Sequence, residues 1–425
     1  MSGTIGSNIV RHSGIIAETA AGLSWTTAVV TGSTVTVEAG NGYFINTTSN
    51  ACTVTLPSSA EAGDQIVLVD YARNWGTNKI IIDSNGLKFQ GETDDYTVEY
   101  TTDGQSLNIV YSDSTKGWLP LEDDVVADEP VTPQTQKAII AFGSGGPTNV
   151  SNLVNSSGVV GSDVTGVGTA REDLGAATYG LDKAIFAYGH DGTNYVSMSN
   201  LVSNSGVVAT DTTGVGTARS SSKAAEYGVD KAIFAYGTTG SAISVSNLVT
   251  NAGVIGTYVT GVGTARFYMG ATRYGLDKAI FGFGYTGSQV SMTNLVTNAG
   301  VVGSDVTGVG TARRNITATG YGSTGQAIFA YGFLGGESYT AVSNLVSNVG
   351  VVASDTSATN GAKTNRSATN YGGDKAIFAF GYNAGTDGYI NTRNLVNSSG
   401  VIATDASGAG TARQTAPGAG YSTSA

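Results

Sequence analysis

The stretch Lys183-Ala-Ile-Phe-Ala-Tyr-Gly189 decides the fold of most of this chain, because close variants of it recur at a fixed spacing. Asn-Leu-Val follows in every copy, and Gly-Val-Gly-Thr-Ala-Arg, which first ends at Arg171, recurs with the same period. Repetition of this kind is the signature of a repeat architecture. The copies are 46 to 49 residues apart and begin at Lys137, Lys183, Lys231, Lys278, Gln326 and Lys375.

Each unit of about 47 residues has the pattern of four short strands and leaves no room for a long amphipathic helix. The strand runs are β-branched or aromatic and are separated by Gly, Asn and Ser. The second strand is apolar on both faces, as expected where sheets stack face to face. A four-strand period of this size predicts an all-β propeller with one blade per copy. In the second copy the expected strands are Leu174–Gly180, Lys183–Gly189, Val196–Ser203 and Val207–Asp211.

The repeat resembles the kelch-type β-propeller over residues 135–425, which implies six blades. The resemblance rests on the order of an arginine, a small apolar inner strand, an aromatic-rich second strand that ends in Gly, and a third strand. The chain departs from the kelch pattern in two ways. Tyr188-Gly189 stands where a double glycine is typical, and all three tryptophans precede the repeats.

The two ends of the repeat region predict how the ring closes. The first copy, at Lys137, has no inner strand upstream, because Asp128–Pro133 is not strand-like. The chain ends with a surplus inner strand, Arg413–Tyr421. We therefore expect this strand to pair beside Lys137–Gly143 and to join both ends of the region in one blade.

Residues 31–121 lack the repeat and show short alternating strands, which predict a small antiparallel β-sandwich or jelly roll. Residues 1–30 fit neither module and are interpreted as a docking segment or as a tail packed on the sandwich, with two helical turns at Ile15–Leu23. Residues 122–134 predict an acidic, proline-containing linker. The sandwich resembles a β-module of bacteriophage tail fibres, notably of marine phages, in the order of Gly42–Thr48, Thr53–Pro57, Ala62–Asp64, Asn85-Gly86, Val110-Tyr111 and Gly117-Trp118.

Composition argues against several classes of function. Two histidines and one cysteine exclude a zinc cluster, a disulfide framework and a histidine-based triad. A net charge of −11 argues against binding to nucleic acid or anionic lipid. The apolar runs are far shorter than the ~20 residues of a membrane helix, and the N-terminus has no secretion signal. We predict no enzyme activity, no catalytic residue, no metal, no cofactor, no nucleic-acid partner and no membrane insertion.

The arginines at the starts of the inner strands form a ring in a propeller and allow two interpretations. They could hold an anionic ligand near the axis, or they could join neighbouring blades by charge-assisted hydrogen bonds. The second interpretation is favoured because an acid precedes four of them by eight positions, although Tyr258 replaces the acid before Arg266. These pairs are Asp163/Arg171, Asp211/Arg219, Asp305/Arg313 and Asp405/Arg413.

Two connections vary between copies, namely the loop after the second strand and the two residues after each arginine. We expect both to emerge on one face, where propellers carry binding sites, although neutral drift of exposed loops also explains the variation. Aromatic rings stack on the C–H faces of sugars and amides bind hydroxyls, so this face predicts a neutral or weakly charged glycan as ligand. The candidate ligand-binding residues are Tyr195, Phe267, Tyr268, Tyr285, Phe333, Tyr339, Tyr382 and Tyr389.

The tail-fibre resemblance implies a virion appendage that is made in the host cytoplasm. Its N-terminal region would dock on other virion proteins, and its propeller would attach to a host-surface glycan or receptor. A homo-oligomer, a trimer by analogy with the resembled fibres, is also implied. The alternatives are a purely structural virion component, such as a capsid decoration or tail-nozzle protein, and a glycan-cleaving enzyme, for which a unique acid–nucleophile set is missing.

Overall fold

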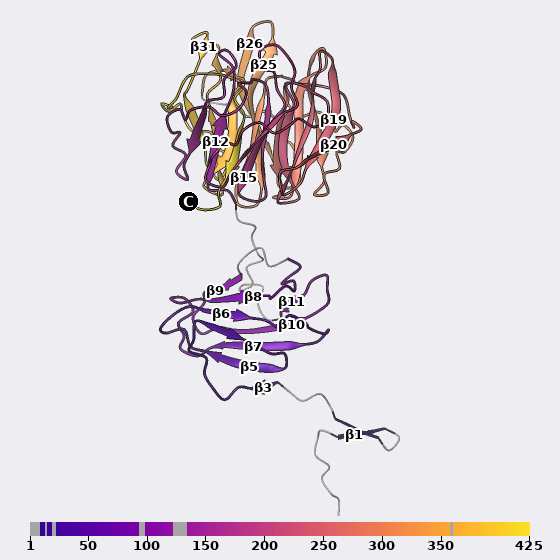
Figure 1. The fold of residues 1–425 in the computed structure, drawn as a ribbon, viewed down its shortest axis with the longest axis vertical. Helices are drawn as coiled ribbons and strands as arrows, with labels where there is room; N and C mark the ends of the chain where they lie inside the picture. The colour runs from indigo at the N-terminus through magenta and orange to yellow at the C-terminus, as the bar shows by residue number, and fades with distance from the viewer. Residues whose placement is uncertain (1–8, 13–14, 19–22, 93–97, 122–133, 358–359) are drawn as a thin grey trace, which may run out of the picture. The chain divides into compact units, whose positions relative to one another are not determined.

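The computed structural model describes residues 9–12, 15–18, 23–92, 98–121, 134–357 and 360–425 (Figure 1). The chain divides into two compact units, Met1–Thr132 and Pro133–Ala425. Every regular element of the described residues is a β-strand, so the all-β class is confirmed. Among these residues we find no helix that could span a membrane. The linker expected at 122–134 lies outside the described residues except for Gln134.

The first unit contains a hairpin and two sheets. The hairpin pairs β1 (Ile9–His12) with β2 (Ile15–Glu18), so the helical turns expected at Ile15–Leu23 are wrong. One sheet contains β3 (Ser24–Trp25), β5 (Asn41–Ile45), β7 (Gln65–Asp70), β10 (Ser106–Tyr111) and β11 (Trp118–Pro120). The other contains β4 (Thr34–Thr36), β6 (Cys52–Thr55), β8 (Ile80–Asp83) and β9 (Val98–Tyr100).

The antiparallel arrangement predicted for this sandwich is wrong for part of it, because the two sheets are mixed. From β3 to β8, successive strands alternate between the two sheets, and neighbours within each sheet therefore run parallel. The pairs β8–β9, β7–β10 and β10–β11 are antiparallel. The alternating pattern that predicted the strands reports side-chain direction alone, and this period of two is common to parallel and antiparallel strands.

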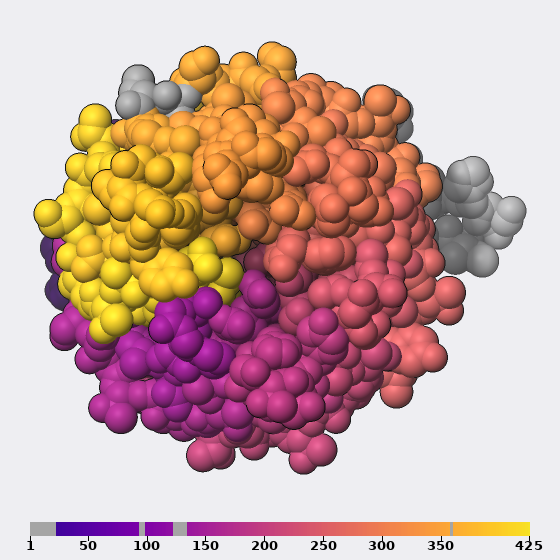
Figure 2. Space-filling view, turned by 90° about the horizontal axis from the view of Figure 1, so that it is seen from above, coloured from indigo at the N-terminus to yellow at the C-terminus, as the bar shows by residue number. Residues whose placement is uncertain are grey.

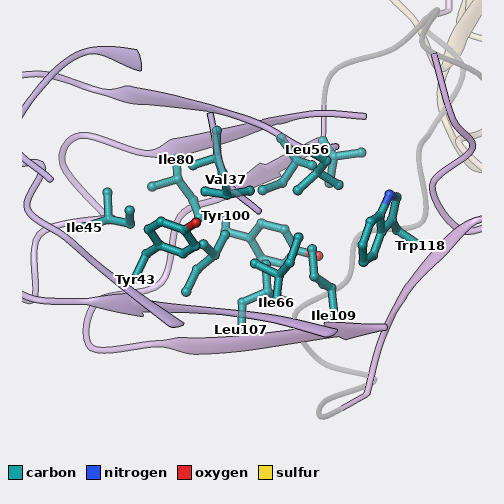
Figure 3. Packing of buried hydrophobic residues seen from close by; sticks show 14 of the residues in the cluster. Val37, Tyr43, Ile45, Leu56, Ile66, Ile80, Tyr100, Leu107, Ile109 and Trp118 are labelled. Carbon is teal, nitrogen blue, oxygen red and sulfur yellow. The ribbon is translucent and has the colours of Figure 1, made fainter. Parts of the chain in front are cut away.

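Side chains from both sheets fill one core in the first unit (Figure 3). Leu56, Ile66, Ile109 and Trp118 are fully buried between the sheets. Cys52 also lies in this core, and burial raises the pKa of its thiol. The first unit therefore has a hydrophobic core of its own.

In the second unit, each repeat forms one antiparallel sheet. The first sheet takes its inner strand from the end of the chain: β33 (Gly418–Tyr421) pairs with β12 (Lys137–Ala141), which also pairs with β13 (Ser151–Val154). The predicted pairing of the C-terminal strand is thus confirmed. The other sheets are β14 (Gly175–Tyr179), β15 (Lys183–Ala187) and β16 (Ser199–Val202); β17 (Lys223–Tyr227), β18 (Lys231–Thr238), β19 (Ala242–Val249) and β20 (Ile255–Val259); β21 (Gly270–Tyr274), β22 (Lys278–Tyr285) and β23 (Gln289–Val296); β24 (Thr317–Tyr321), β25 (Gln326–Gly335) and β26 (Ser338–Val346); and β28 (Ser367–Tyr371), β29 (Lys375–Ala379) and β32 (Arg393–Val396). A small extra sheet joins β27 (Lys363–Thr364), β30 (Tyr382–Asn383) and β31 (Gly388–Tyr389).

The predicted fourth strand is present as a strand only in β20 among the described repeats. Elsewhere it is reduced to isolated bridges, such as Val202–Val208 and Ser199–Thr212 at the segment expected over Val207–Asp211. In that segment the Asp211 carboxylate accepts hydrogen bonds from Thr169 and from the Asn200 side chain. Tyr258 stands at the equivalent place in β20, where it pairs with Asn247 along the ladder.

The sheets of the second unit stack through their faces. Ile185 and Ala187 of β15 belong to the apolar cluster shared with β18, whereas Ala184 and Phe186 belong to the cluster shared with β12. This arrangement confirms that the second strand is buried on both faces. Inner strands touch in the order β14, β17, β21, β24, β28 and β33, and β33 also contacts β14. In Figure 2 the C-terminal part of the unit (yellow) accordingly lies beside its first part (magenta).

Candidate functional site

In each repeat an aromatic–glycine pair follows the second strand or interrupts its ladder, and it bends the chain there. In the second copy, Tyr188 and Gly189 both have positive φ, 66° and 104°. The Gly189 N–H donates to the carbonyl of Arg219 in the next sheet at 2.9 Å. A Cβ on Gly189 would lie 2.7 Å from the carbonyl oxygen of Glu172, so this position requires glycine. The bend buries the Tyr188 ring against the next sheet.

The buried arginines join successive sheets, as Arg313 illustrates. Its Nε donates to the carbonyl of Tyr331 at 2.9 Å, and Nη2 donates to Asn344 Oδ1 at 2.6 Å, both within its own sheet. Its Cζ lies 4.3 Å from the ring centroid of Phe283, which belongs to the preceding sheet. Burial lowers the pKa of the guanidinium to about 10, and the nearby Asp355 opposes this shift. Equivalent contacts are Arg171 on Phe142, Arg219 on Tyr188, Arg266 on Tyr236, Arg366 on Tyr331 and Arg413 on Phe380.

Where an arginine has an acid beside it, that acid differs from the one expected, and among the described residues Arg219 has none because Tyr258 occupies the place. Arg171 lies near Asp211 of the segment after its third strand, and the Asp163 carboxylate expected for it accepts hydrogen bonds from Thr411 beside Arg413. The reason is that the inner strand and the third strand of a sheet run parallel and therefore begin at the same edge of the sheet. Arg171 precedes the inner strand at this edge, and the segment after the third strand brings Asp211 back to the same edge. Hydrogen bonds from Thr411 and Asn152 lower the pKa of Asp163, although its burial opposes the shift. The contacts of these arginines therefore favour the second interpretation, in which they join neighbouring sheets.

The sixth copy departs from the repeat at the arginine and keeps this network with different residues. Lys363 takes the place of the arginine, and its Nζ donates to Asp405 at 2.9 Å. Arg366, three residues later, supplies the guanidinium that donates to Asn394 and covers the Tyr331 ring at 4.9 Å. A single copy can thus change its sequence and retain the contact.

The two variable connections meet on one face of the second unit, as predicted. The residue after each arginine, or after Lys363 in the sixth copy, pairs with the residue that follows the aromatic–glycine bend. Three successive pairs contain a Phe or Tyr ring, and the remaining three contain no aromatic side chain apart from the imidazole of His190. The residue types on this face therefore differ from one repeat to the next. The pairs are Glu172/His190, Ser220/Thr238, Phe267/Tyr285, Arg314/Phe333, Thr364/Tyr382 and Ser144/Gln414.

The structure brings four of the eight candidate residues together in a groove of about 310 Å³, which we call the aromatic groove. Phe333 contacts Tyr339 with ring centroids 5.1 Å apart, Tyr339 contacts Tyr382 at 5.7 Å, and Tyr382 contacts Tyr389 at 6.4 Å. The Tyr382 hydroxyl donates to Asp387, and this hydrogen bond raises the pKa of Tyr382 to about 12. Figure 2 looks onto this face, where the β25–β26 hairpin (orange) and β31 (yellow) lie. The remaining lining residues are Arg314, Asn315, Thr364, Asn365 and Gln414.

The other four candidates lie outside the groove. Phe267 and Tyr285 contact each other with centroids 5.6 Å apart and extend the aromatic row towards Arg314. Tyr268 lines a separate cavity of about 60 Å³, and burial raises the pKa of its hydroxyl. Tyr195 is 38% exposed and contacts His190 on the polar side of the face.

The axis of the second unit holds buried charges in small cavities. Arg273 Nη1 donates to Glu226 Oε1 at 3.0 Å, and burial raises the pKa of Glu226 to about 7. At the other cavity, burial raises the pKa of Asp173 to about 6, opposed by Lys223. Each cavity measures about 60 Å³, which is room for a few waters and about a fifth of the volume of the aromatic groove.

The sequence prediction did not include Arg314, Asn315 and Gln414, because it rested on aromatic residues in the variable loops. The doubled arginine Arg313-Arg314 at a variable position was the available signal.

Within the described residues, no group of three or more His, Cys, Asp and Glu side chains is placed to hold a metal. No protein-family model matches the chain, and no curated protein matches it either.

Proposed function

We propose that residues 135–425 form a six-bladed, kelch-like β-propeller whose aromatic groove binds a glycan on a host surface. Three observations support the propeller. The inner strands contact one another in a cycle, the C-terminal strand completes the first sheet, and a guanidinium covers a ring of the preceding sheet in every repeat. A ring of repeated sheets gives each variable loop a fixed place on a common face.

The observation that carries glycan binding is the clustering of half-exposed rings and amides in one groove. Phe333, Tyr339, Tyr382 and Tyr389 line it together with Asn315 and Asn365. Rings of this kind stack on sugar C–H faces, and amides bind hydroxyls. The volume of about 310 Å³ lies at the lower end of the range for ligand sites. The repeat alone would give all six positions the same chemistry, so the concentration of aromatic residues over adjacent repeats favours a ligand site.

The appendage function rests on the resemblance of residues 31–121 to tail-fibre modules. In this proposal the N-terminal region docks on other virion proteins, and the chain forms a homo-oligomer, a trimer by analogy. The propeller then presents its loop face to the host receptor and performs no catalytic step.

A second candidate function, a purely structural virion component, is favoured by a different observation. One valine in the same turn of each repeat is exposed, and five of these are between 61% and 65% exposed. An apolar side chain repeated around the unit suits burial against neighbouring subunits. These five are Val207, Val254, Val301, Val351 and Val401.

The test of glycan binding uses the full chain on an array of bacterial surface polysaccharide fragments. Tyr389→Ala removes a ring at the groove that is 46% exposed, and Tyr195→Ala removes a comparably exposed ring outside it. We expect the first variant to weaken binding at least several-fold and the second to bind as the wild type does. Equal effects of both substitutions, or no binding to any fragment, would contradict the proposed site.

Imaging of assembled particles with a label on the C-terminus separates the two functions. A repeat unit at the distal, exposed end of an appendage supports attachment. A repeat unit enclosed by neighbouring subunits supports the structural role.

A further inference from the structure

We propose that the aromatic groove selects an acidic sugar and that Arg314 binds the sugar's carboxylate. This inference rests on the proposed function, because it names the ligand class of the same site. It adds a charged partner to a site that the sequence associated with a neutral or weakly charged glycan.

Arg314 lines the groove and is only half-buried, whereas the arginines at the starts of the inner strands are buried and donate to an asparagine side chain or a backbone carbonyl. Arg266, Arg273 and Arg313 each have a carboxylate oxygen within 4.0 Å. In the described part of the chain Arg314 forms no such ion pair, and its Nε has no hydrogen-bond partner. A guanidinium without a counter-ion, in a groove of ligand size, is a ready partner for an anion.

The Arg314 guanidinium packs against two aromatic rings. Its Cζ lies 4.5 Å from the ring centroid of Tyr285 and 4.8 Å from that of Phe333. Its backbone exchanges two hydrogen bonds with Phe333, at 3.0 and 2.7 Å. The rings hold the planar group and shield it without neutralising it, so little side-chain entropy is lost when a carboxylate binds.

Neighbouring polar atoms suit the hydroxyls of the same sugar. Asn315 Oδ1 is buried without a hydrogen-bond partner and lines the groove beside Arg314. Asn365 Nδ2 donates to Gln414 Oε1 at 3.0 Å, which orders the polar wall. Tyr339 and Tyr382 provide ring faces for the apolar side of the sugar.

The charge of the chain limits how acidic the ligand can be. The net charge of −11 repels a dense polyanion, and Asp387 lies at the rim, where it accepts a hydrogen bond from Tyr382. A glycan with isolated carboxylates, such as a uronic or nonulosonic acid within neutral sugars, satisfies both conditions. A phosphate-rich polymer does not.

The experiment compares each glycan with its carboxyl-reduced form, so that ring stacking is retained and only the charge is lost. Uronate-bearing and nonulosonate-bearing fragments are printed in separate sets, both native and reduced, and are probed with the full chain. We expect binding to at least one native set, with at least a tenfold loss on carboxyl reduction. Binding of that set should also weaken as salt is raised, because the contact is ionic.

The variants assign the effect to one side chain. Arg314→Gln should reduce binding of the native glycan at least tenfold and leave binding of the reduced glycan unchanged. Arg314→Lys keeps the charge but loses the planar fork, so it should restore only part of the affinity. Tyr195→Ala is the control, and near-ultraviolet circular dichroism checks that each variant keeps its fold.

The outcomes separate this inference from the proposed function. Equal, groove-dependent binding of native and reduced glycans would overturn the role of Arg314 and leave glycan binding intact. Carboxylate-dependent binding that Arg314→Gln does not change would also overturn it. If no glycan binds in either form, the proposed function itself is contradicted.

Discussion

Deletion of Arg413–Ala425 from the full chain tests how the second unit is completed. The deletion removes β33, which pairs with β12 over four residue positions, and leaves one edge of that strand unpaired. It also removes Arg413, which donates to Asn152 Oδ1 at 2.7 Å and covers Phe380. The deletion should therefore lower the free energy of unfolding of the second unit far more than the loss of a frayed terminus would.

The magnitude follows from two buried side chains. Removing one partner of a buried charged network costs about 3–5 kcal/mol, and Arg413 is 2% exposed. Removing a buried aromatic side chain costs about 3–5 kcal/mol, and Tyr421 is 4% exposed. A loss of about 6–10 kcal/mol approaches the whole stability of a typical domain, about 5–15 kcal/mol. The melting temperature of the second unit should fall by at least about 10 °C.

The assay can follow the two units separately, because all three tryptophans lie in the first one. Tryptophan fluorescence should show unchanged unfolding of the first unit, while calorimetry shows the early transition of the second. Deletion of the last three residues, Thr423–Ala425, is the matched control and should change neither transition. If the longer deletion lowers the second transition by less than about 2 °C, β33 does not complete the unit and the reasoning fails.

Three further predictions concern the repeat framework. Arg313→Lys should cost about 2–4 kcal/mol in denaturant unfolding, because an ammonium cannot reproduce the fork and the stacked plane; a loss below about 0.5 kcal/mol would contradict the network. Gly189→Ala should cost about 2 kcal/mol more than Gly240→Ala, since both have φ near 100° but only Gly189 has backbone within 3 Å of the added Cβ; equal losses would remove the steric argument. The pKa of Glu226 is raised by burial to about 7 from 4.5, so the folded state keeps a proton that the unfolded state releases, and stability falls as pH rises through this window. The unfolding free energy of the wild type minus that of Glu226→Gln should decrease from pH 4.5 to about 7 and then stay constant; a difference independent of pH would show that Glu226 is not shifted.

Some features of the site could be predicted from sequence only in part. The alternation of variable and repeated positions predicted that two connections share a face, and the pairing of Arg314 with Phe333 confirms it. The same reasoning could not tell which aromatic residues come together, because that depends on the lengths of the hairpins. β25 and β26 extend to Gly335 and Ser338 and reach the groove, whereas the shorter loop at Tyr195 does not.

The sequence by itself determined the all-β class, the repeat and the pairing of its last strand with its first. These features are periodic or local, so each can be recognised from residue types and spacing alone. The tertiary structure decided which acid lies beside which arginine, that strands β3 to β8 of the first unit pair in parallel, and that Arg314 has no counter-ion among the described residues. These depend on which segments meet in space: Asp211 and Arg171 are far apart in the chain and meet because parallel strands of one sheet begin at the same edge.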